Sequence, residues 1–506
     1  MPRLRLLIPA LAAALLAACA PSADPAADTA VRRYGRLAFQ PCTLASEYAP
    51  SGIEAQCARL RVPENPNARS GRTIALNIAW LPVTNEGAAT ADPVFFLAGG
   101  PGQAATDAWP LLDAAFAEVR KNRHVILVDQ RGTGRSHALT CRNAEGENAF
   151  TEDETESADD AAALQAAAAF AARCAASLDA DPRFYTTSDA VRDLDTVRAA
   201  LGAERINLVG GSYGTRVAQQ YAMRHPDRVR TLVLDGLVPN ELVLGSEHAR
   251  NLDAALALQF ARCKELSACR ARFGEDLRAQ LRTLMQRLEA QPVEVDYRHP
   301  ETGAPTRGRA TAGTVAALTR MFAYWPEAAS LLPLILHEAD RGRYEPLMAT
   351  ATLVTGQVGE QITHGMQLSV ICAEDADRLR DDPADLDTVL GTQLSRVLLA
   401  QCKVWPTGTR PADFHAPLKS QAPALLLSGE FDPVTPPRYG EQVLKGLPNG
   451  RHLVLRGRGH GSFAVGCVPK LLAQFLERAD ARALDAGCLD TLRYVPPFTS
   501  FNGWEP

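Results

Sequence analysis

Short apolar runs alternate with amphipathic helical patterns through much of the chain, and this alternation restricts the possible folds more than any other feature. Apolar runs of this kind are typical of strands in a parallel sheet that helices cover on both faces. The predicted strands are residues 73–81, 94–99, 124–130, 206–210, 229–236, 424–430 and 451–457. The sequence therefore predicts an α/β fold built on a mostly parallel sheet.

Between Pro239 and about Pro417 the pattern becomes mostly helical, with amphipathic candidates at 251–266 and 276–291. Two sequential domains are one explanation, but the last two strands would then have no sheet to join. We therefore expect one sheet domain that carries an inserted helical cap. The expected division is a signal peptide (1–18), a flexible tether (19–38), the sheet domain (39–239 and 417–506) and the cap (240–416).

The N-terminus predicts export. Arg3 and Arg5 precede an apolar stretch, residues 6–18, which is short for a membrane span of about 20 residues. The sequence "LAAC" at 16–19 resembles the lipobox of bacterial lipoproteins, which implies lipidation of Cys19. Ala20 is not the aspartate that tends to retain lipoproteins at the inner membrane, which favours a periplasm-facing outer-membrane anchor. An ordinary signal peptide cut near "ACA", giving a secreted protein, is the alternative.

Of the 11 cysteines, ten remain once Cys19 is set aside, and an even number in an oxidising compartment favours disulfides. Sequence alone does not fix the connectivity, but pairing neighbours in chain order keeps each loop within one local segment. A metal site is the rival interpretation, although no CxxC or HxxxH spacing supports it. The hypothesised pairs are Cys42 with Cys57, Cys141 with Cys174, Cys263 with Cys269, Cys372 with Cys402, and Cys467 with Cys488.

Charge and composition exclude several classes of partner. The net charge of −5 comes from interspersed acidic and basic residues with no long basic run, so neither nucleic acid nor an anionic membrane surface is expected as a partner. A lipid anchor at Cys19 is the only membrane contact we expect. The sequence does not indicate an oligomeric state.

A helix is predicted within residues 185–202, directly before the strand at 206–210. Thr187 or Ser188 is a suitable N-cap for this helix. Its three aspartates are expected to be charges on the helix surface, and they are Asp189, Asp193 and Asp195.

Ser212 lies in "GGSYG", residues 210–214, between an apolar run and a helical pattern. Short Gly/Ser patterns often mark only a tight turn. Here, however, the strand, turn and helix context is that of a nucleophile elbow, in which small residues let a sharp turn hold the serine outward. The helix N-terminus after the serine would also favour developing negative charge. Ser212 is therefore a candidate nucleophile.

A serine nucleophile needs a base and an orienting acid, which follow it on loops after late strands in α/β-hydrolases. Asp432 lies two residues beyond one late strand, and His460 just beyond the next. Glu430 competes for the role of the acid but lies nearer its strand. His460 is flanked by Gly459 and Gly461, which allow close approach to a serine. The predicted triad is Ser212, His460 and Asp432.

An oxyanion hole requires two backbone N–H donors. The amide of Tyr213, directly after the serine, is one candidate. The loop "LAGGPGQ", residues 97–103, is expected to supply the other, since its glycines let backbone approach a substrate. Pro101 has no N–H group, so Gly100 is the predicted donor. The alternative is that these residues form only a Gly-Pro turn.

Taken in order, "AGGPG" (98–102), "DQRGTGRS" (129–136), "GGSYG", "GEFDPVTPP" (429–437) and "GRGHG" (457–461) resemble the serine peptidases that include prolyl iminopeptidases and secreted tripeptidyl aminopeptidases. The resemblance runs from about residue 40 to the C-terminus. It implies an α/β-hydrolase fold, a helical cap and cleavage of short peptides at a free N-terminus without a metal or organic cofactor. Many relatives have histidine or asparagine-proline before the glycines, where this chain has Ala98.

The family's exopeptidases hold the free α-amine of the peptide substrate with carboxylates of the cap. By this resemblance Glu374 is a candidate amine anchor, although it could equally be part of a charged loop beside Cys372. Asp129 and Arg131 are expected to be structural pins of the early loops. A carboxylic ester hydrolase with the same triad, and a catalytically silent envelope-binding lipoprotein, are the rival functions.

Overall fold

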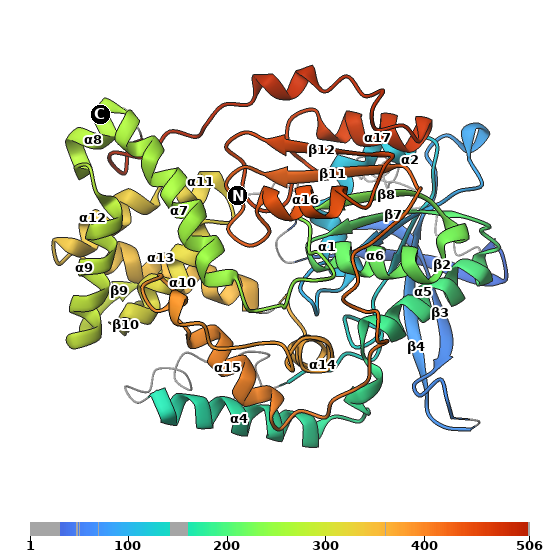
Figure 1. Cartoon of the computed structure of the whole chain (residues 1–506), viewed down its shortest axis with the longest axis horizontal. Coiled ribbons are helices and arrows are strands. Elements are labelled where there is room, and N and C mark those ends of the chain that lie inside the picture. Colours follow the sequence, from blue (N-terminus) through green and yellow to red (C-terminus); the bar gives the residue numbers. More distant parts are fainter. Residues whose placement is uncertain are drawn as a thin grey trace, which may run out of the picture.

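The computed structural model describes residues 31–503 except 47, 48, 50, 69, 142–159 and 360. In this part of the chain, ten strands form one sheet with helices on both faces (Figure 1). The order across the sheet is β1-β2-β3-β4-β6-β5-β7-β8-β11-β12. The strands are β1 (Arg32–Tyr34), β2 (Leu37–Leu44), β3 (Ile53–Pro63), β4 (Thr73–Leu81), β5 (Val94–Leu97), β6 (Val125–Val128), β7 (Ile206–Gly211), β8 (Val229–Asp235), β11 (Ala424–Gly429) and β12 (Gly450–Leu455).

The predicted α/β fold with a mostly parallel sheet is confirmed. From β6 to β12 neighbouring strands are parallel, whereas β1 to β4 form an antiparallel edge that joins the rest through β4 and β6. Each predicted strand is present, with ends displaced by at most two residues. The predicted tether over 19–38 is wrong at its C-terminal end, because β1 and the start of β2 pair in register there.

The two faces of the sheet bury alternate side chains of each parallel strand, as the two-residue period of a strand requires. In β8, Leu232 and Leu234 belong to one buried cluster and Val233 to the other. The first cluster is covered by α5 (Thr187–Leu201), α6 (Tyr213–Arg224) and α16 (Pro437–Leu444). The second is covered by α1 (Ala105–Ala108), α2 (Ala117–Arg120) and α17 (Val468–Arg478).

The helix before β7 differs from the prediction in two details. Helix α5 begins at Thr187, but its N-cap is Thr186, whose side chain and that of Asp189 form a reciprocal capping box. Asp189 and Asp193 are buried, not surface charges. Asp193 is buried because it forms an ion pair with Arg131 at 2.7 Å, and Arg131 also donates to the carbonyl of Glu64. Arg131 thus makes the contacts of a structural pin.

The chain between β8 and β11 is mainly helical, as predicted, and also contains a two-stranded hairpin of β9 (Val293–Arg298) and β10 (Pro305–Ala310). Its first part has a buried cluster of its own, to the left of the sheet in Figure 1. The helices are α7 (His248–Glu265), α8 (Ser267–Phe273), α9 (Leu277–Ala290), α10 (Ala312–Phe322), α11 (Pro326–Ala329), α12 (Leu332–Asp340), α13 (Glu345–Gly359), α14 (His364–Glu374) and α15 (Gln393–Cys402).

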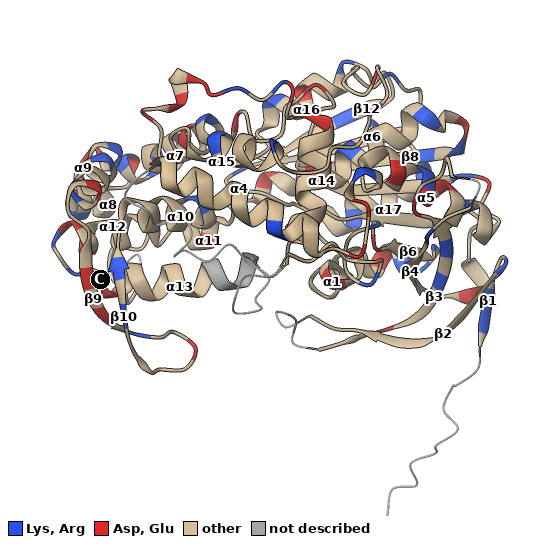
Figure 2. Cartoon of the chain, turned by 90° about the horizontal axis from the view of Figure 1, so that it is seen from below, with Lys and Arg blue, Asp and Glu red and all other residues tan. Residues whose placement is uncertain are grey.

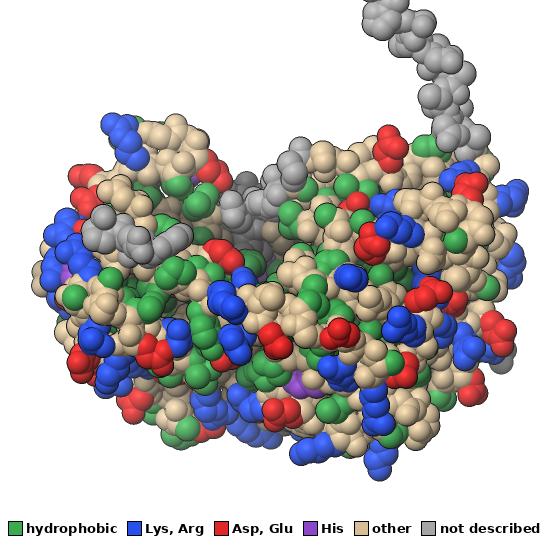
Figure 3. Space-filling model, turned by 90° about the horizontal axis from the view of Figure 1, so that it is seen from above, with side chains coloured by type: hydrophobic (Ala, Val, Ile, Leu, Met, Phe, Trp, Pro, Cys, Tyr) green, Lys and Arg blue, Asp and Glu red, His purple; other side chains and the backbone are tan. Residues whose placement is uncertain are grey.

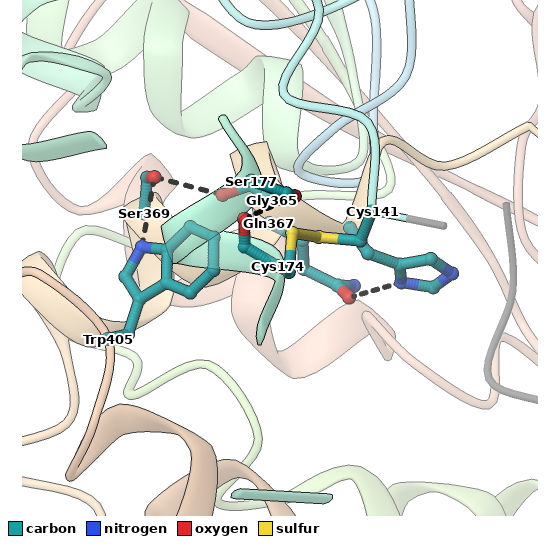
Figure 4. Close-up of a disulfide and its surroundings, with 8 residues drawn as sticks. Cys141, Cys174, Ser177, Gly365, Gln367, Ser369 and Trp405 are labelled. Atoms are coloured by element: carbon teal, nitrogen blue, oxygen red, sulfur yellow. Dashed lines mark hydrogen bonds between the residues drawn. A yellow bond between two sulfur atoms is a disulfide. The ribbon is translucent and has the colours of Figure 1, made fainter. Parts of the chain in front are cut away.

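Helix α14 packs on the sheet side of the molecule, since Met366 and Val370 belong to the same buried cluster as α5 and α6. Beside it, α15 lies along α4 (Asp160–Ser177) (Figure 1). Figure 4 shows the Cys141–Cys174 disulfide next to Trp405, whose indole N–H donates to Ser369 of α14 at 3.1 Å. The inserted segment is therefore tied to the sheet domain through its last two helices.

Five disulfides are present in the described residues, and they join the same cysteines as the hypothesised pattern. They connect Cys42 with Cys57, Cys141 with Cys174, Cys263 with Cys269, Cys372 with Cys402, and Cys467 with Cys488. Within the same residues, no group of three or more His, Cys, Asp or Glu side chains could hold a metal ion.

The C-terminal segment leaves the sheet domain, which differs from the predicted division. Tyr494 stacks on Phe431 at 5.6 Å, and Phe498 packs against the buried cluster of α7 to α13. The backbone N–H of Phe498 donates to the carbonyl of Ser330 at 2.8 Å. Residues beyond Tyr494 therefore help to hold the inserted helices.

The described surface carries interspersed charges of both signs (Figures 2 and 3). None of the described helices combines the length and hydropathy needed to cross a membrane. The predicted signal peptide and the predicted lipidation site Cys19 lie outside the described residues.

Candidate active site

Ser212 occupies a sharp turn between β7 and α6. Its φ of 53° and ψ of −126° put a residue other than glycine in a strained backbone region. The flanking glycines allow the turn, because a Cβ on Gly210 would lie 2.5 Å from the carbonyl oxygen of Gly214. A Cβ on Gly214 would lie 2.1 Å from the carbonyl oxygen of Leu97. This is the local geometry predicted for a nucleophile elbow.

Asp432 and His460 form a hydrogen-bonded pair beyond the ends of β11 and β12. Nδ1 of His460 lies 2.8 Å from Oδ2 of Asp432. Thr435 donates its hydroxyl to the same oxygen at 2.8 Å, and the amides of Val434 and Thr435 donate to Oδ1, each at 2.8 Å. Four donors thus fix the carboxylate, which is buried.

Charge coupling within the pair suits proton transfer. Burial would raise the pKa of Asp432, but the nearby imidazole and the N–H donors outweigh it and lower the pKa below its ordinary value. For His460, burial opposes the charged form, yet Asp432 and, secondarily, Asp235 raise the pKa above its ordinary value. The acid therefore stays ionised while the imidazole gains affinity for a proton.

The competing acid, Glu430, is turned away from this pair. Its Oε2 accepts the backbone N–H of Gly457 at 2.7 Å, and its Oε1 accepts the Tyr494 hydroxyl at 3.2 Å. Glu430 therefore joins two loops and makes no hydrogen bond to His460 among the described contacts. Between the two candidates, the geometry favours Asp432.

A turn between α10 and α11 of the inserted segment packs on the histidine. The backbone N–H of His460 donates to the carbonyl of Tyr324 at 2.9 Å, and the two rings meet edge to face at 5.4 Å. Gly459 is required there, because a Cβ would lie 2.1 Å from the Tyr324 carbonyl oxygen. Next to it, Trp325 is 47% exposed. The inserted helices thus form one wall beside the imidazole.

The loop at residues 98–103 lies against the serine turn, since a Cβ on Gly99 would be 3.1 Å from Cβ of Ser212. Gly100 has a φ of 105°, a backbone conformation that favours glycine. Within the described residues, no acceptor takes the amide N–H of Gly100 or of Tyr213. Two free donors therefore flank the serine, as an oxyanion hole requires.

The Tyr213 side chain is buried beneath the turn. Its hydroxyl lies 2.6 Å from the Thr187 hydroxyl and accepts a hydrogen bond from Gln130 at 3.2 Å. Burial, together with the charge of Glu374, raises its pKa, so the phenol stays neutral. The ring thus anchors the first turn of α6 and leaves only the backbone amide to face the site.

Glu374 does not lie where an amine anchor is needed. The side chain is fully buried, and its two oxygens accept the backbone N–H and the hydroxyl of Thr187 at 2.6 and 2.9 Å. Burial raises its pKa to about 8. A fully buried side chain whose two oxygens are both bonded to Thr187 has none free for a substrate amine, which contradicts the expected role.

The next residue, Asp375, joins α14 to the helix that carries the serine. It forms an ion pair with Arg216 of α6 at 2.8 Å, and both side chains are 0% exposed. Arg216 also donates to the carbonyls of Pro239 and Leu242. Because removal of one partner leaves a buried charge uncompensated, this pair fixes the inserted segment to the site.

We predict that Arg216→Met lowers the free energy of unfolding by about 3–5 kcal/mol, since Asp375 would remain buried without its partner. Chemical unfolding of the oxidised protein measures the change. The matched control is Arg224→Met, which breaks the exposed pair with Asp413 and should cost at most about 1 kcal/mol. Equal losses in the two variants would contradict the importance of the buried pair.

Two contacts of the site escaped sequence reasoning. Thr435 supports Asp432 from three residues later, a spacing at which a short polar residue could have signalled a turn around the carboxylate. Asp235 is the last residue of β8, beside the serine turn, and its place at the end of an apolar run was the available signal.

A family model described as the alpha/beta hydrolase fold matches residues 92–466. Serine protease Hip1 of Mycobacterium tuberculosis (strain H37Rv) is 24% identical over 477 residues, covering 87% of this chain and 88% of that protein. The tripeptidyl aminopeptidase of Streptomyces lividans is 30% identical over 190 residues, covering 36% of this chain and 35% of that protein.

The proline iminopeptidase of Neisseria gonorrhoeae is 32% identical over 146 residues, covering 29% of this chain and 32% of that protein. Among solved structures, the proline iminopeptidase of Mycobacterium smegmatis matches 84% of this chain and 100% of its own, with a TM-score of 0.41 and 20% identity. The family match covers well over half of the chain, and the sheet order and elbow agree with it. The chain therefore belongs to the α/β-hydrolase fold family.

Proposed function

We propose that the chain is a serine peptidase that cleaves short peptides from a free N-terminus, with Ser212, His460 and Asp432 as its catalytic triad. The observation that carries the proposal is the hydrogen-bonded pair of Asp432 and His460 beyond the ends of β11 and β12. Ser212 stands at the end of β7, on the same edge of the sheet. The names of the peptidase relatives support peptides as substrates.

In the proposed mechanism, Oγ of Ser212 attacks the carbonyl carbon of the scissile bond while Nε2 of His460 takes the hydroxyl proton. Asp432 holds the other ring nitrogen and stabilises the imidazolium that forms. The amides of Gly100 and Tyr213 donate to the oxyanion of the tetrahedral intermediate. His460 then gives its proton to the leaving amine, and water activated by the same imidazole hydrolyses the acyl-enzyme.

Export remains part of the proposal, and the five disulfides support it, because such bonds persist in oxidising compartments. Glu374 has no place in the proposed site. The amine of the substrate must be held by another group.

A free-amine requirement tests the proposal. We predict that an aminoacyl or tripeptidyl arylamide is cleaved roughly 100-fold faster, or more, than its N-acetylated form, because a site built for a polar group rejects an analogue that lacks it. Rates of arylamine release measure this ratio, and product masses show whether one or three residues leave.

Ser212→Ala serves as the control, since it should cleave neither substrate. Comparable rates on the free and acetylated substrates would discard the aminopeptidase assignment and favour an ester hydrolase or another acyl hydrolase. Release of the arylamine by the alanine variant at more than about a tenth of the wild-type rate would contradict the role of Ser212 as nucleophile.

A further inference from the structure

Asp235 is a buried carboxylate between the Ser212 turn and the loop that carries His460. It is the last residue of β8 and is 1% exposed. Its backbone carbonyl accepts the amide N–H of Ser212 at 2.8 Å. Its Oδ2 accepts the amide N–H groups of Ser462 and Phe463 at 2.6 and 3.1 Å. Asp235 thus holds the backbone of Ser212 and the backbone just after His460.

The main chain after Asp235 also touches the imidazole. A Cβ on Gly236 would lie 3.0 Å from Cε1 of His460 and 3.1 Å from the Thr435 hydroxyl oxygen. Only a glycine lets β8 end this close to the ring, since Gly236 also has a φ of 63°. The main chain that follows Asp235 therefore packs on the imidazole, close to its contact with Asp432.

The hydrogen bonds of Asp235 do not by themselves require a carboxylate. An asparagine oxygen could accept the same two amides, and its NH₂ group could meet the Ser462 hydroxyl. Oδ1 of Asp235 and Oγ of Ser462 are both buried without a well-directed partner. Because unsatisfied buried polar atoms are costly, the choice of aspartate must bring something that asparagine lacks, namely negative charge.

That charge is present at neutral pH. Burial raises the pKa of Asp235 to about 6, against the opposing effects of the Ser462 amide and the nearby His460. Above this pH the side chain is an anion, and it contributes to the raised pKa of His460. A need for negative charge near the imidazole would explain why an aspartate is buried at this position.

We propose that Asp235 is a positioning residue for the triad, which holds the His460 loop against the Ser212 turn and supplies a second negative charge near the imidazole. During attack His460 becomes an imidazolium, and this charge stabilises it. The inference rests on the proposed function, because Asp235 acts only through His460.

The other titratable groups that interact with the imidazole do not change their protonation state over the pH range of the test. Asp432 has a lowered pKa and stays ionised. Burial, Arg320 and His460 lower the pKa of His248 to about 3, so His248 stays neutral. Asp235, whose pKa is about 6, and His460, whose pKa is raised, titrate as a coupled pair.

The test measures the rate constant for inactivation by a fluorophosphonate between about pH 4.5 and 9. In that reaction Oγ of Ser212 displaces fluoride from phosphorus while His460 takes the hydroxyl proton, so the rate falls when His460 is protonated beforehand. Removal of the Asp235 charge lowers the pKa of the imidazole. In the plot of this rate constant against pH, the acidic limb is the range in which the rate rises as His460 loses its proton. We expect Asp235→Asn to move this acidic limb to lower pH by about 0.5–1 unit and to lower the rate constant on the plateau above it roughly 10-fold.

A second variant, Ser462→Ala, keeps both amide hydrogen bonds and removes the hydroxyl that helps to lower the pKa of Asp235. It should shift the limb in the same direction by less, and it carries the test if Asp235→Asn does not fold. The control is Asp92→Asn, which removes a carboxylate at the opposite end of the sheet, beside Arg123 and Asn207. Its limb should match that of the wild type.

The outcomes separate the two proposals. No reaction of the wild-type protein would overturn the proposed function itself. Normal reaction of the wild type together with an unmoved limb in both Asp235→Asn and Ser462→Ala would overturn the role of the Asp235 charge alone. A downward shift confined to these two variants supports it, because a purely structural role would lower the rate without moving the limb.

Discussion

Replacing Ser212 with alanine is expected to lower kcat for any substrate of the protein by a factor of about 10⁴ to 10⁶. Without Oγ no acyl-enzyme forms, and only the oxyanion donors and substrate binding remain to accelerate attack by water. The fold should be unaffected, because alanine keeps the same Cβ at the positive φ of the turn. Steady-state kinetics on an arylamide or an activated ester, with thermal unfolding as a check on stability, give the result.

Ser177→Ala is a matched control for this change. Its hydroxyl donates only to the carbonyl of Cys174 at the end of α4, so its loss should leave kcat unchanged. Retention of more than about a tenth of wild-type activity by Ser212→Ala would contradict its role as nucleophile.

Asp432→Asn is expected to reduce kcat by about 10⁴ with little change in KM. The amides of Val434 and Thr435 both need an acceptor, so the asparagine oxygen should take the place of Oδ1. Its NH₂ group would then face Nδ1 of His460 as a donor. The imidazole would be forced into the tautomer that carries its proton on Nε2, where it cannot accept the serine proton.

Glu430→Gln provides the comparison, because Glu430 was the competing candidate for the acid. Its oxygens accept from Gly457 and Tyr494, so the amide should preserve most of the activity. A loss of about 10⁴ in Glu430→Gln with near-normal activity in Asp432→Asn would assign the acid to Glu430 instead.

Most strands that sequence reasoning identified are buried on both faces, and the edge strand β12 is the exception. β5, β6 and β11 are buried along their whole length, so their sequences are continuous apolar runs that the hydrophobic pattern shows directly. β2 and β3 lie toward the edge of the sheet and expose alternate residues, including Glu54, Arg59 and Arg61. Their mixed sequences look like a loop unless the partner strands are already known.

Charges inside the fold were harder to place. Asp193 has the spacing of a helix-surface residue, and only the tertiary contact with Arg131 buries it. Glu374 and Asp375 are adjacent in the sequence, yet one accepts from Thr187 and the other pairs with Arg216. These partners are more than 150 residues away, so local pattern carries no information about them.

The core of the candidate site, by contrast, was predictable, because the order of serine, acid and histidine at strand ends follows from the topology. The structure brings Asp432 and His460 into contact and sets the Gly99–Gly100 loop against Ser212. Sequence reasoning did not identify Asp235 or Thr435, since the turn signals at these positions do not reveal hydrogen bonds that exist only after the loops have closed.

The most direct test of the account is to map the residue modified by a fluorophosphonate in the folded, oxidised protein. The account predicts one covalent adduct, found by peptide mass analysis on the tryptic peptide that contains Ser212 and absent from Ser212→Ala. Heat-unfolded protein should not react, because the nucleophile depends on His460 and Asp432 being in place. An unmodified Ser212 in folded wild-type protein, or an adduct on another residue, would contradict the central claim.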